Sequence, residues 1–253
     1  MRQNFLRFLY VFFVAAIVFV PDTVWAQSVT IDLGGTEVGA SGDSVAGRIV
    51  QMVALLTVLS LAPGILIMMT SFTRIVVVLS FLRTAMGTQQ TPPNTVLMSL
   101  ALFMTFFIMS PVFNTAYDEG IAPLVNGEIT EVQAFERSAE PFKDFMLKNV
   151  REKDLELFVK LHNDPNLERV EDTPIHVVIP AFMITELRRA FEIGFMLFLP
   201  FLVIDLVTAA ILMSMGMMML PPVLIALPFK IIFFVLVDGW YLVVGSLMDS
   251  FKS

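Results

Sequence analysis

Long apolar stretches dominate this chain of 253 residues and constrain its fold more than any other feature. Apolar residues make up 57% of the sequence and charged residues only 15%, whereas a soluble domain averages about 25% charged residues. The apolar residues also occur in blocks long enough to cross a hydrocarbon core of about 30 Å. We therefore expect an all-α integral membrane protein.

The first 26 residues have the pattern of a secretory signal peptide. Arg2 and Arg7 precede an apolar stretch of 13 residues, and a small-residue end closes at Ala26. Because 13 residues are short for a membrane span, we expect cleavage between Ala26 and Gln27. Residues 27–44 then form a flexible external leader rich in Gly, Ser, Thr and Asp. The alternative is that the apolar stretch is kept as a first transmembrane helix.

Breaks in the apolar pattern divide the rest of the chain into three parts. Residues 45–113 are interrupted by a breaker segment at Gly87–Asn94 and are expected to form a first transmembrane helical hairpin. Residues 114–178 hold fourteen Asp or Glu, seven Lys or Arg and no long apolar run. Residues 179–253 are expected to form a second transmembrane hairpin, with a charged interval at 186–189 near its start.

The acidic segment is expected to form a small helical layer outside the membrane. Its apolar residues fall on one side of a helical wheel. This face comprises Phe142, Met146, Val150 and Phe158, together with Leu157 and Leu161. We expect it to pack on the same or a neighbouring subunit. Arg74 and Arg83 flank a short break and favour a cytoplasmic position for it, which places the acidic segment on the periplasmic side.

A short pattern occurs twice in the sequence. Met86-Gly87 is followed after four residues by Pro92-Pro93, and Met215-Gly216 is followed after four residues by Pro221-Pro222. Broken apolar segments at matching positions of two halves point to functional sites in membrane proteins. A true internal repeat and a chance match of so short a pattern both remain open.

The second copy of this pattern lies in a methionine cluster, with five methionines between Met213 and Met219. Gly216 and the Pro221-Pro222 pair are loop breakers, so we expect no straight helix here. Methionine is unbranched, flexible and polarizable, so it adapts to irregular contacts. A ring of such loops is suited to sealing a pore around a passing polypeptide. The alternative is that the methionines fill a core.

Seven ionisable residues lie within or beside the apolar segments of the second half: Glu186, Arg188, Arg189, Glu192, Asp205, Lys230 and Asp238. Charges there are costly and usually face a bundle interior, a partner or water. Glu186 and Lys230 have opposite signs and flank the methionine cluster, so we expect them to pair within or between subunits. In the alternative interpretation, the charges at 186–189 mark the start of an interfacial helix.

Several classes of function find no support in the sequence. Without cysteine there is no disulfide framework, thiolate metal site or cysteine nucleophile. The net charge of −7 and the lack of a basic stripe argue against nucleic-acid binding. The two histidines lack ligands at metal spacing, and no hydrolase or nucleotide-binding motif occurs. We expect neither enzymatic activity nor a cofactor.

Several stretches resemble the FliP family of type III export proteins. They are PAFMITELRRAFEIGF from Pro180 to Phe195, the run from Pro200 to Trp240, IMMTSFTRI from Ile67 to Ile75, and GTQQTPPN from Gly87 to Asn94. Together they extend over nearly all of the mature chain.

The resemblance implies a core subunit of the flagellar export gate, in the bacterial inner membrane at the flagellar basal body. In that family several copies, commonly five, assemble with FliQ and FliR, and FlhA and FlhB complete the apparatus. It implies a pore constriction at Met217, Met218 and Met219 and an intersubunit ion pair of Glu186 with Lys230. It also implies bent helical hairpins lifted partly out of the bilayer. Unfolded flagellar proteins would be the exported substrates.

Two other classes of function compete with this interpretation. In an ion or small-solute channel, Asp205, Glu186 and Lys230 would line the pathway. A membrane enzyme acting on lipids would need a polar cluster with metal or acid–base spacing, which the sequence does not contain.

Overall fold

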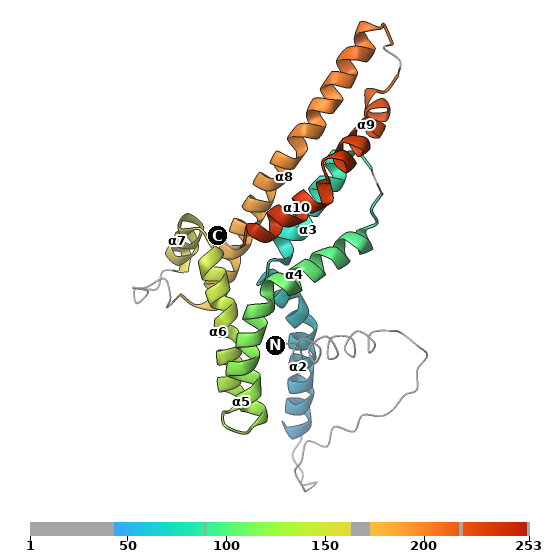
Figure 1. Cartoon of the computed structure of the whole chain (residues 1–253). Helices are drawn as coiled ribbons and strands as arrows, with labels where there is room; N and C mark the ends of the chain where they lie inside the picture. The colour runs from blue at the N-terminus through green and yellow to red at the C-terminus, as the bar shows by residue number, and fades with distance from the viewer. Residues whose placement is uncertain (1–42, 89, 163–172, 218–219, 252–253) are drawn as a thin grey trace. The chain divides into compact units, whose positions relative to one another are not determined.

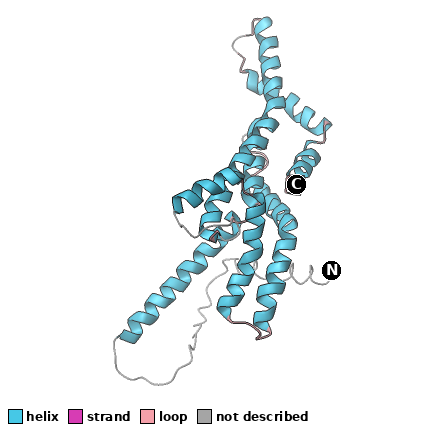
Figure 2. Cartoon of the chain, turned by 90° about the vertical axis from the view of Figure 1, so that its left-hand side faces the viewer, coloured by secondary structure: helices cyan, strands magenta, loops and turns pink. Residues whose placement is uncertain are grey.

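The computed structural model describes residues 43–88, 90–162, 173–217 and 220–251. These residues are helical, with short connecting loops and no strand among them (Figure 2). The chain divides into two units, Met1–Val50 and Gln51–Ser253. The expected signal peptide, its cleavage site at Ala26–Gln27 and nearly all of the leader lie outside the described residues. The expected all-α fold is confirmed for the part that the structure describes.

The helices follow one another with few residues between them. In chain order they are α2 (Asp43–Met68), α3 (Phe72–Met86), α4 (Asn94–Ala116), the π-helical turn η1 (Tyr117–Ile121), α5 (Ala122–Val125), α6 (Glu131–Asn149), α7 (Glu152–His162), α8 (Ile175–Ser214), α9 (Pro222–Leu236) and α10 (Gly239–Asp249). The start of α6 is fixed by a capping box: the Gln133 backbone N–H donates to the Thr130 hydroxyl oxygen, and the Thr130 backbone N–H donates to Gln133 Oε1.

Helix α8 is the longest element of the second unit, and other helices lie along it (Figure 1). In the alternative interpretation the charges at 186–189 mark the start of a helix, but α8 begins earlier, at Ile175, and continues through them. Glu, Leu and Arg are good helix formers. In addition, Arg188 Nε donates to Glu192 Oε1 at 2.8 Å, an i,i+4 pair that supports the helix.

Two hydrophobic cores lie along α8. The first holds α3, α4, α9 and α10 against the middle of α8, with Ile75, Leu79 and Leu247 fully buried. The second holds α6 and α7 against the first turns of α8, with Met146 and Phe182 fully buried. Because both cores share α8, helices α6 and α7 pack in one structure with α3, α4, α9 and α10.

Helix α3 approaches α8 closely at Gly194. A Cβ added there would lie 2.6 Å from Cδ2 of Phe81, which is too close for two carbon atoms. The Phe81 ring also packs edge to face on Phe191, with centroids 5.0 Å apart. A glycine at this position therefore lets an aromatic side chain of α3 lie against the backbone of α8.

The last apolar segment is bent rather than straight. Helices α9 and α10 meet at an angle of 63°, so the apolar stretch from Val223 to Leu247 does not form one straight helix. The break occurs at Asp238, which has a left-handed backbone with φ of 51°. Asp is one of the few non-glycine residues that adopt this conformation readily.

Two helical stretches are long and apolar enough to cross a membrane, Asn94–Val125 and Ile175–Ser214, and the bent α9–α10 pair is a third candidate among the described residues. The 40 residues of α8 measure about 60 Å at 1.5 Å per residue, twice the hydrocarbon core of about 30 Å. The end from Ile193 to Ser214 alone spans about 33 Å. The chain is thus a membrane protein in which α8 extends well beyond one hydrocarbon layer.

Candidate functional site

The methionine cluster forms a helix end followed by a tight turn. The Gly216 N–H donates to the Met213 carbonyl at 3.0 Å, and the Met217 N–H donates to the Leu212 carbonyl at 3.0 Å. This pair of bonds is a Schellman motif, which requires a left-handed residue after the helix. Gly216 supplies it with φ of 72°. Helix α8 therefore stops where the sequence predicted a breaker.

Helix α9 begins immediately after the loop. Pro221 is its N-cap, with an extended ψ of 113°, and Pro222 is its first helical residue. Proline suits the first helical position because its missing N–H has no partner there in any case. Gly216, Pro221 and Pro222 thus end one helix and start the next.

The described methionines of this region face outward in the single chain. Met213, Met215 and Met217 are 59%, 61% and 43% exposed. Core filling within one subunit does not account for side chains with this exposure. Met218 and Met219 lie outside the described residues.

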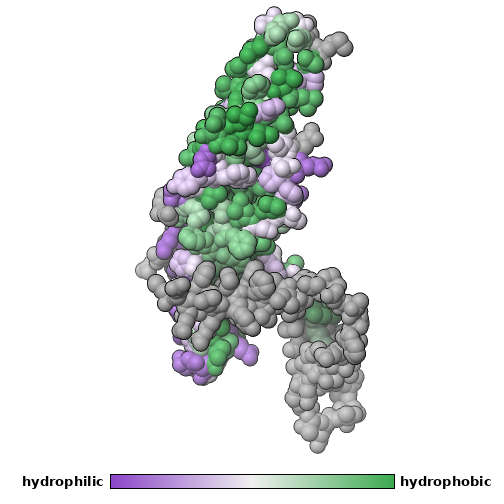
Figure 3. Space-filling model, turned by 45° about the vertical axis from the view of Figure 1, so that its right-hand side comes forward, coloured by the Kyte–Doolittle hydropathy of each residue, from purple (hydrophilic) through white to green (hydrophobic). Residues whose placement is uncertain are grey.

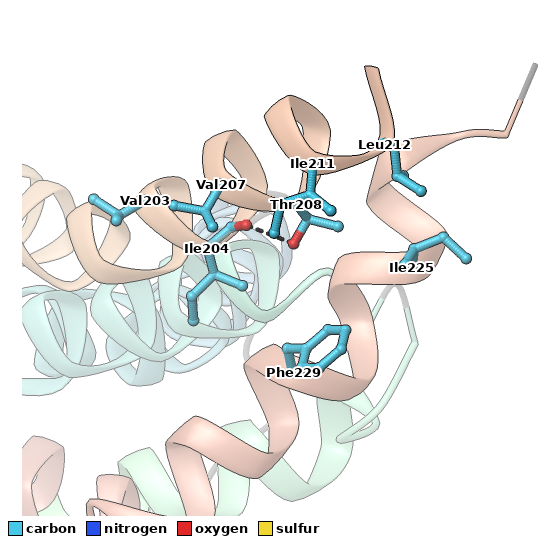
Figure 4. A pocket seen from close by; sticks show the side chains of 8 residues that line it. All are labelled: Val203, Ile204, Val207, Thr208, Ile211, Leu212, Ile225 and Phe229. Carbon is cyan, nitrogen blue, oxygen red and sulfur yellow. Dashed lines mark hydrogen bonds between the residues drawn. The ribbon is translucent and has the colours of Figure 1, made fainter. Parts of the chain in front are cut away.

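An apolar pocket of about 390 Å³ lies below the loop, between α8 and α9 (Figure 4). Six of its lining residues come from α8, among them Val203 and Ile211, and α9 contributes Ile225 and Phe229. The Thr208 hydroxyl donates to the Ile204 carbonyl of its own helix at 2.8 Å. The pocket therefore offers no free polar donor from this threonine.

Glu186 is fully buried and bonded to an arginine of α3. Arg74 Nε donates to Glu186 Oε2 at 2.8 Å, and Arg74 Nη2 donates to Oε1 at 2.5 Å. Both residues are 0% exposed. Two parallel N–H···O bonds between a guanidinium and a carboxylate are the strong, oriented form of an ion pair. This pair fixes α3 against α8.

Lys230 joins α9 to two other helices. Its Nζ donates to Asp205 Oδ2 of α8 at 2.6 Å and to the Ala85 carbonyl of α3 at 3.1 Å. The Ala85 carbonyl belongs to the last turn of α3, where backbone acceptors lack helical partners and attract cations. Lys230 is 4% exposed. Asp205 Oδ1 is buried and accepts no hydrogen bond from the described residues.

The expected pairing of Glu186 with Lys230 is therefore wrong within one chain. Arg74 is the partner of Glu186, and Asp205 is the partner of Lys230. The mistake arose because sequence patterns identify buried charges of opposite sign but not which helices meet. The pairing between two subunits stays a prediction.

The predicted apolar face of the acidic segment is divided between two helices. Phe142 and Met146 of α6 lie in the second core, and Val150 and Phe158 pack partly buried against it. Leu157 and Leu161 are 51% and 71% exposed and do not share that face. The single wheel fails because α6 ends at Asn149 and α7 starts in a new direction at Glu152.

A polar contact that the sequence did not reveal docks α7 on α8. The Thr185 hydroxyl donates to Asp154 Oδ2 at 2.7 Å, and Arg151 Nη2 donates to Asp154 Oδ1 at 2.8 Å. The hydrogen bond from Arg151, assisted by that from Thr185, holds the pKa of Asp154 below its usual range. An arginine three residues before an aspartate was the available signal for the local pair, but Thr185 lies 31 residues away.

The two histidines come together without forming a metal site. His162 at the end of α7 and His176 at the start of α8 have ring centroids 5.1 Å apart in an edge-to-face arrangement. No group of three or more potential metal ligands occurs within the described ranges.

Comparison with known proteins agrees with the resemblance. The model of the FliP family matches residues 55–247. The chain is 59% identical over 233 residues to the flagellar biosynthetic protein FliP of Caulobacter vibrioides, a match that covers 92% of this chain and 85% of that protein. It is 57% identical over 202 residues to FliP of Bacillus subtilis, covering 80% and 91%. It is 52% identical over 241 residues to FliP of Rhizobium meliloti, covering 94% and 97%. This chain therefore belongs to the FliP family of flagellar biosynthetic proteins.

Proposed function

We propose that this membrane-bound component of the flagellar export apparatus is a core subunit of a gated pore for unfolded flagellar proteins. The pore crosses the inner membrane at the flagellar basal body, with the α6–α7 segment on the periplasmic side. Several copies, commonly five in the family, build it together with FliQ and FliR, and FlhA and FlhB complete the gate. The loop after α8 supplies the constriction, through Met217, Met218 and Met219.

The observation that carries this proposal is the exposed methionine at the end of the α8–α9 hairpin. Gly216 and Pro221 interrupt the helix, so the loop has a fixed start and a fixed end. Met217 between them is 43% exposed in the single chain. An irregular backbone at membrane depth is tolerated only where protein or a water-filled cavity surrounds it. A ring of such loops around a pore meets that condition.

The chemistry of methionine suits a seal that must open for different cargo. Its unbranched side chain changes shape at little cost and keeps contact with many surfaces. β-Branched side chains seal well but adapt poorly because their χ1 angle is restricted. Alanine adapts but leaves a gap.

The apolar surface of the hairpins supports association with other subunits. In the most apolar stretch of α8, only 11% of the residues are buried within the chain. Apolar side chains gather on the upper part of the molecule in Figure 3, where the C-terminal end of α8 and the start of α9 lie in Figure 1. Because α8 is longer than one hydrocarbon layer, lipid covers only part of that surface. Neighbouring subunits account for the rest.

The rival interpretation as an ion or small-solute channel loses its main support. Its pathway residues were Glu186, Asp205 and Lys230. Glu186 is fully buried by Arg74, and Lys230 is bonded to Asp205 and to a backbone carbonyl. Charges neutralised inside one subunit serve packing better than they serve ion passage.

The test replaces all three loop methionines in cells that assemble flagella. With alanines we expect resting membranes to leak ions while secretion of flagellar proteins largely continues. With isoleucines we expect a tight membrane and slower secretion. Membrane conductance and secreted protein are measured for both variants. The matched control is Met196→Ala, since Met196 is 69% exposed on α8 but lies outside the loop.

Unchanged conductance and secretion in both triple variants would remove the loop from the gate. The assembly itself is tested separately by native mass spectrometry of the purified complex. We expect several copies of this chain together with FliQ and FliR. Recovery of the chain only as a single subunit would contradict the assembly.

A further inference from the structure

A buried arginine holds the two residues that follow α10. Arg74 Nη1 donates to the Ser250 carbonyl at 3.1 Å and to the Ser250 hydroxyl at 2.9 Å. The Phe251 ring lies against the same guanidinium, with Cζ of Arg74 3.6 Å from the ring centroid. A cation at this distance over an aromatic face is attracted by the ring. Ser250 and Phe251 thus share one cation.

Ser250 completes the set of hydrogen-bond acceptors around Arg74. Glu186 accepts from Nε and Nη2, while Ser250 accepts from Nη1. Without Ser250, Nη1 would keep no acceptor among the described residues. Arg74 is 0% exposed, and a buried donor of a charged group is costly to leave without a partner. Seating of the segment is therefore strongly favoured.

The geometry of Ser250 suits this contact. Ser250 is the C-cap of α10, so its carbonyl is one of those that lack a partner within the helix. Its hydroxyl donates to the Leu247 carbonyl at 2.7 Å, which leaves the oxygen free to accept from Arg74. A cation near the C-terminus of a helix is also favourable.

Phe251 connects the two hydrophobic cores. Its ring packs against the first core, which holds the hairpins. It also stacks on Phe145 of α6, with centroids 6.2 Å apart and planes 21° apart. Phe145 packs against the second core and meets Phe182 of α8 edge to face at 6.0 Å. The Phe251 ring therefore contacts both the Arg74 guanidinium and an aromatic side chain of the acidic segment.

We propose that Ser250 and Phe251 form a strap that positions α6 on the α3–α8 pair, with Arg74 as its binding seat. The seat recognises a backbone carbonyl, a hydroxyl and an aromatic ring supplied by the same chain. The strap transmits the position of α10 to the acidic segment through the Phe251–Phe145 contact. This role is independent of the proposed pore, because it concerns contacts within one subunit.

The test compares two shortened chains in the detergent-purified complex, one ending at Asp249 and a matched control ending at Phe251. Hydrogen exchange is measured for α6 around Phe145 and for α9. In the chain ending at Asp249 we expect α6 amides to exchange at least tenfold faster, with α9 unchanged. In the control we expect wild-type rates in both helices.

Two outcomes overturn the proposal. One is wild-type exchange in α6 without the strap. The other is equally faster exchange in α6 and α9, which would indicate a general loss of stability. If the chain ending at Asp249 is not recovered, Phe251→Leu and Phe251→Trp decide the question. We expect faster α6 exchange in the leucine variant and wild-type exchange in the tryptophan variant, which keeps an aromatic face for Arg74. Equal exchange of the α6 amides in the leucine and tryptophan variants would exclude a role for the contact between the Phe251 ring and Arg74.

Discussion

Glu186→Ala is expected to destabilise the isolated subunit, because it leaves the Arg74 guanidinium buried without its carboxylate. Both side chains are at most 1% exposed, and two hydrogen bonds join them. Removing one partner of such a pair costs about 3–5 kcal/mol. A domain has only about 5–15 kcal/mol of net stability, so the change removes a large share of it.

The assay is chemical unfolding of the detergent-solubilised chain, followed by tryptophan fluorescence. The matched control is Glu192→Ala, which removes a glutamate from the same helix and from an exposed pair with Arg188, 54% and 55% exposed. Such an exposed pair contributes little to stability, because water screens its charges. Replacing Arg74 and Glu186 together by apolar residues is expected to cost less than Glu186→Ala alone, since no buried charge then remains.

A second comparison separates contacts within a subunit from contacts between subunits. In the isolated chain, the swap Glu186→Lys with Lys230→Glu is expected to restore nothing, because each charge has another partner there. Restored assembly of the complex by the same swap would support the intersubunit pair. The reasoning about Arg74 is refuted if Glu186→Ala lowers the free energy of unfolding no more than Glu192→Ala does.

Three further changes test the packing of the second unit. Gly194→Leu is expected to cost about 1–3 kcal/mol by overpacking, because even a Cβ would lie 2.6 Å from Phe81; Phe81→Ala should recover part of this in the same unfolding assay. Met146→Ala is expected to lower the free energy of unfolding by about 2–5 kcal/mol, because Met146 is 0% exposed. The control Leu161→Ala, at a site 71% exposed, should change it by no more than about 0.5 kcal/mol. Equal losses in the two variants would contradict the burial of Met146. The pKa of Asp154 is lowered by its hydrogen bond with Arg151, so its contribution to stability is present above its unfolded pKa of about 3.9 and is lost as pH falls through the lower folded value. Melting temperatures between pH 7 and pH 2 should therefore converge for wild type and Asp154→Asn at the acidic end, and a constant difference would contradict this.

Features that depend on local sequence could be predicted well. The Gly216 helix end and the Pro222 helix start follow from backbone preferences of single residues. The same holds for Gly87, which ends α3 with φ of 76°. Both copies of the repeated pattern thus place a left-handed glycine after a helix. That the chain is a membrane protein could be predicted from its composition and from the length of its apolar stretches alone.

Features that depend on which helices meet could not be predicted. Arg74 and Glu186 are 112 residues apart in the chain, and only the packing of α3 on α8 brings them together. Asp205 and Lys230 lie on opposite sides of the methionine loop, and their pairing needs the hairpin to close in one register. The charges at 186–189 could be interpreted as the start of an interfacial helix, but they lie inside α8, where the residues themselves favour a helix.

The passage of polypeptide along the methionine loop is tested most directly by cross-linking. The chain has no cysteine, so Met217→Cys gives a single reactive thiol in an otherwise unreactive subunit. A flagellar export substrate with one cysteine and a folded domain that stalls it in transit is produced in the same cells. After an oxidant is added, we predict a disulfide between the stalled substrate and position 217, and none with the control Phe135→Cys, although Phe135 in α6 is more exposed, at 77% against 43% for Met217. Cross-linking at position 135 but not at 217 would contradict the account.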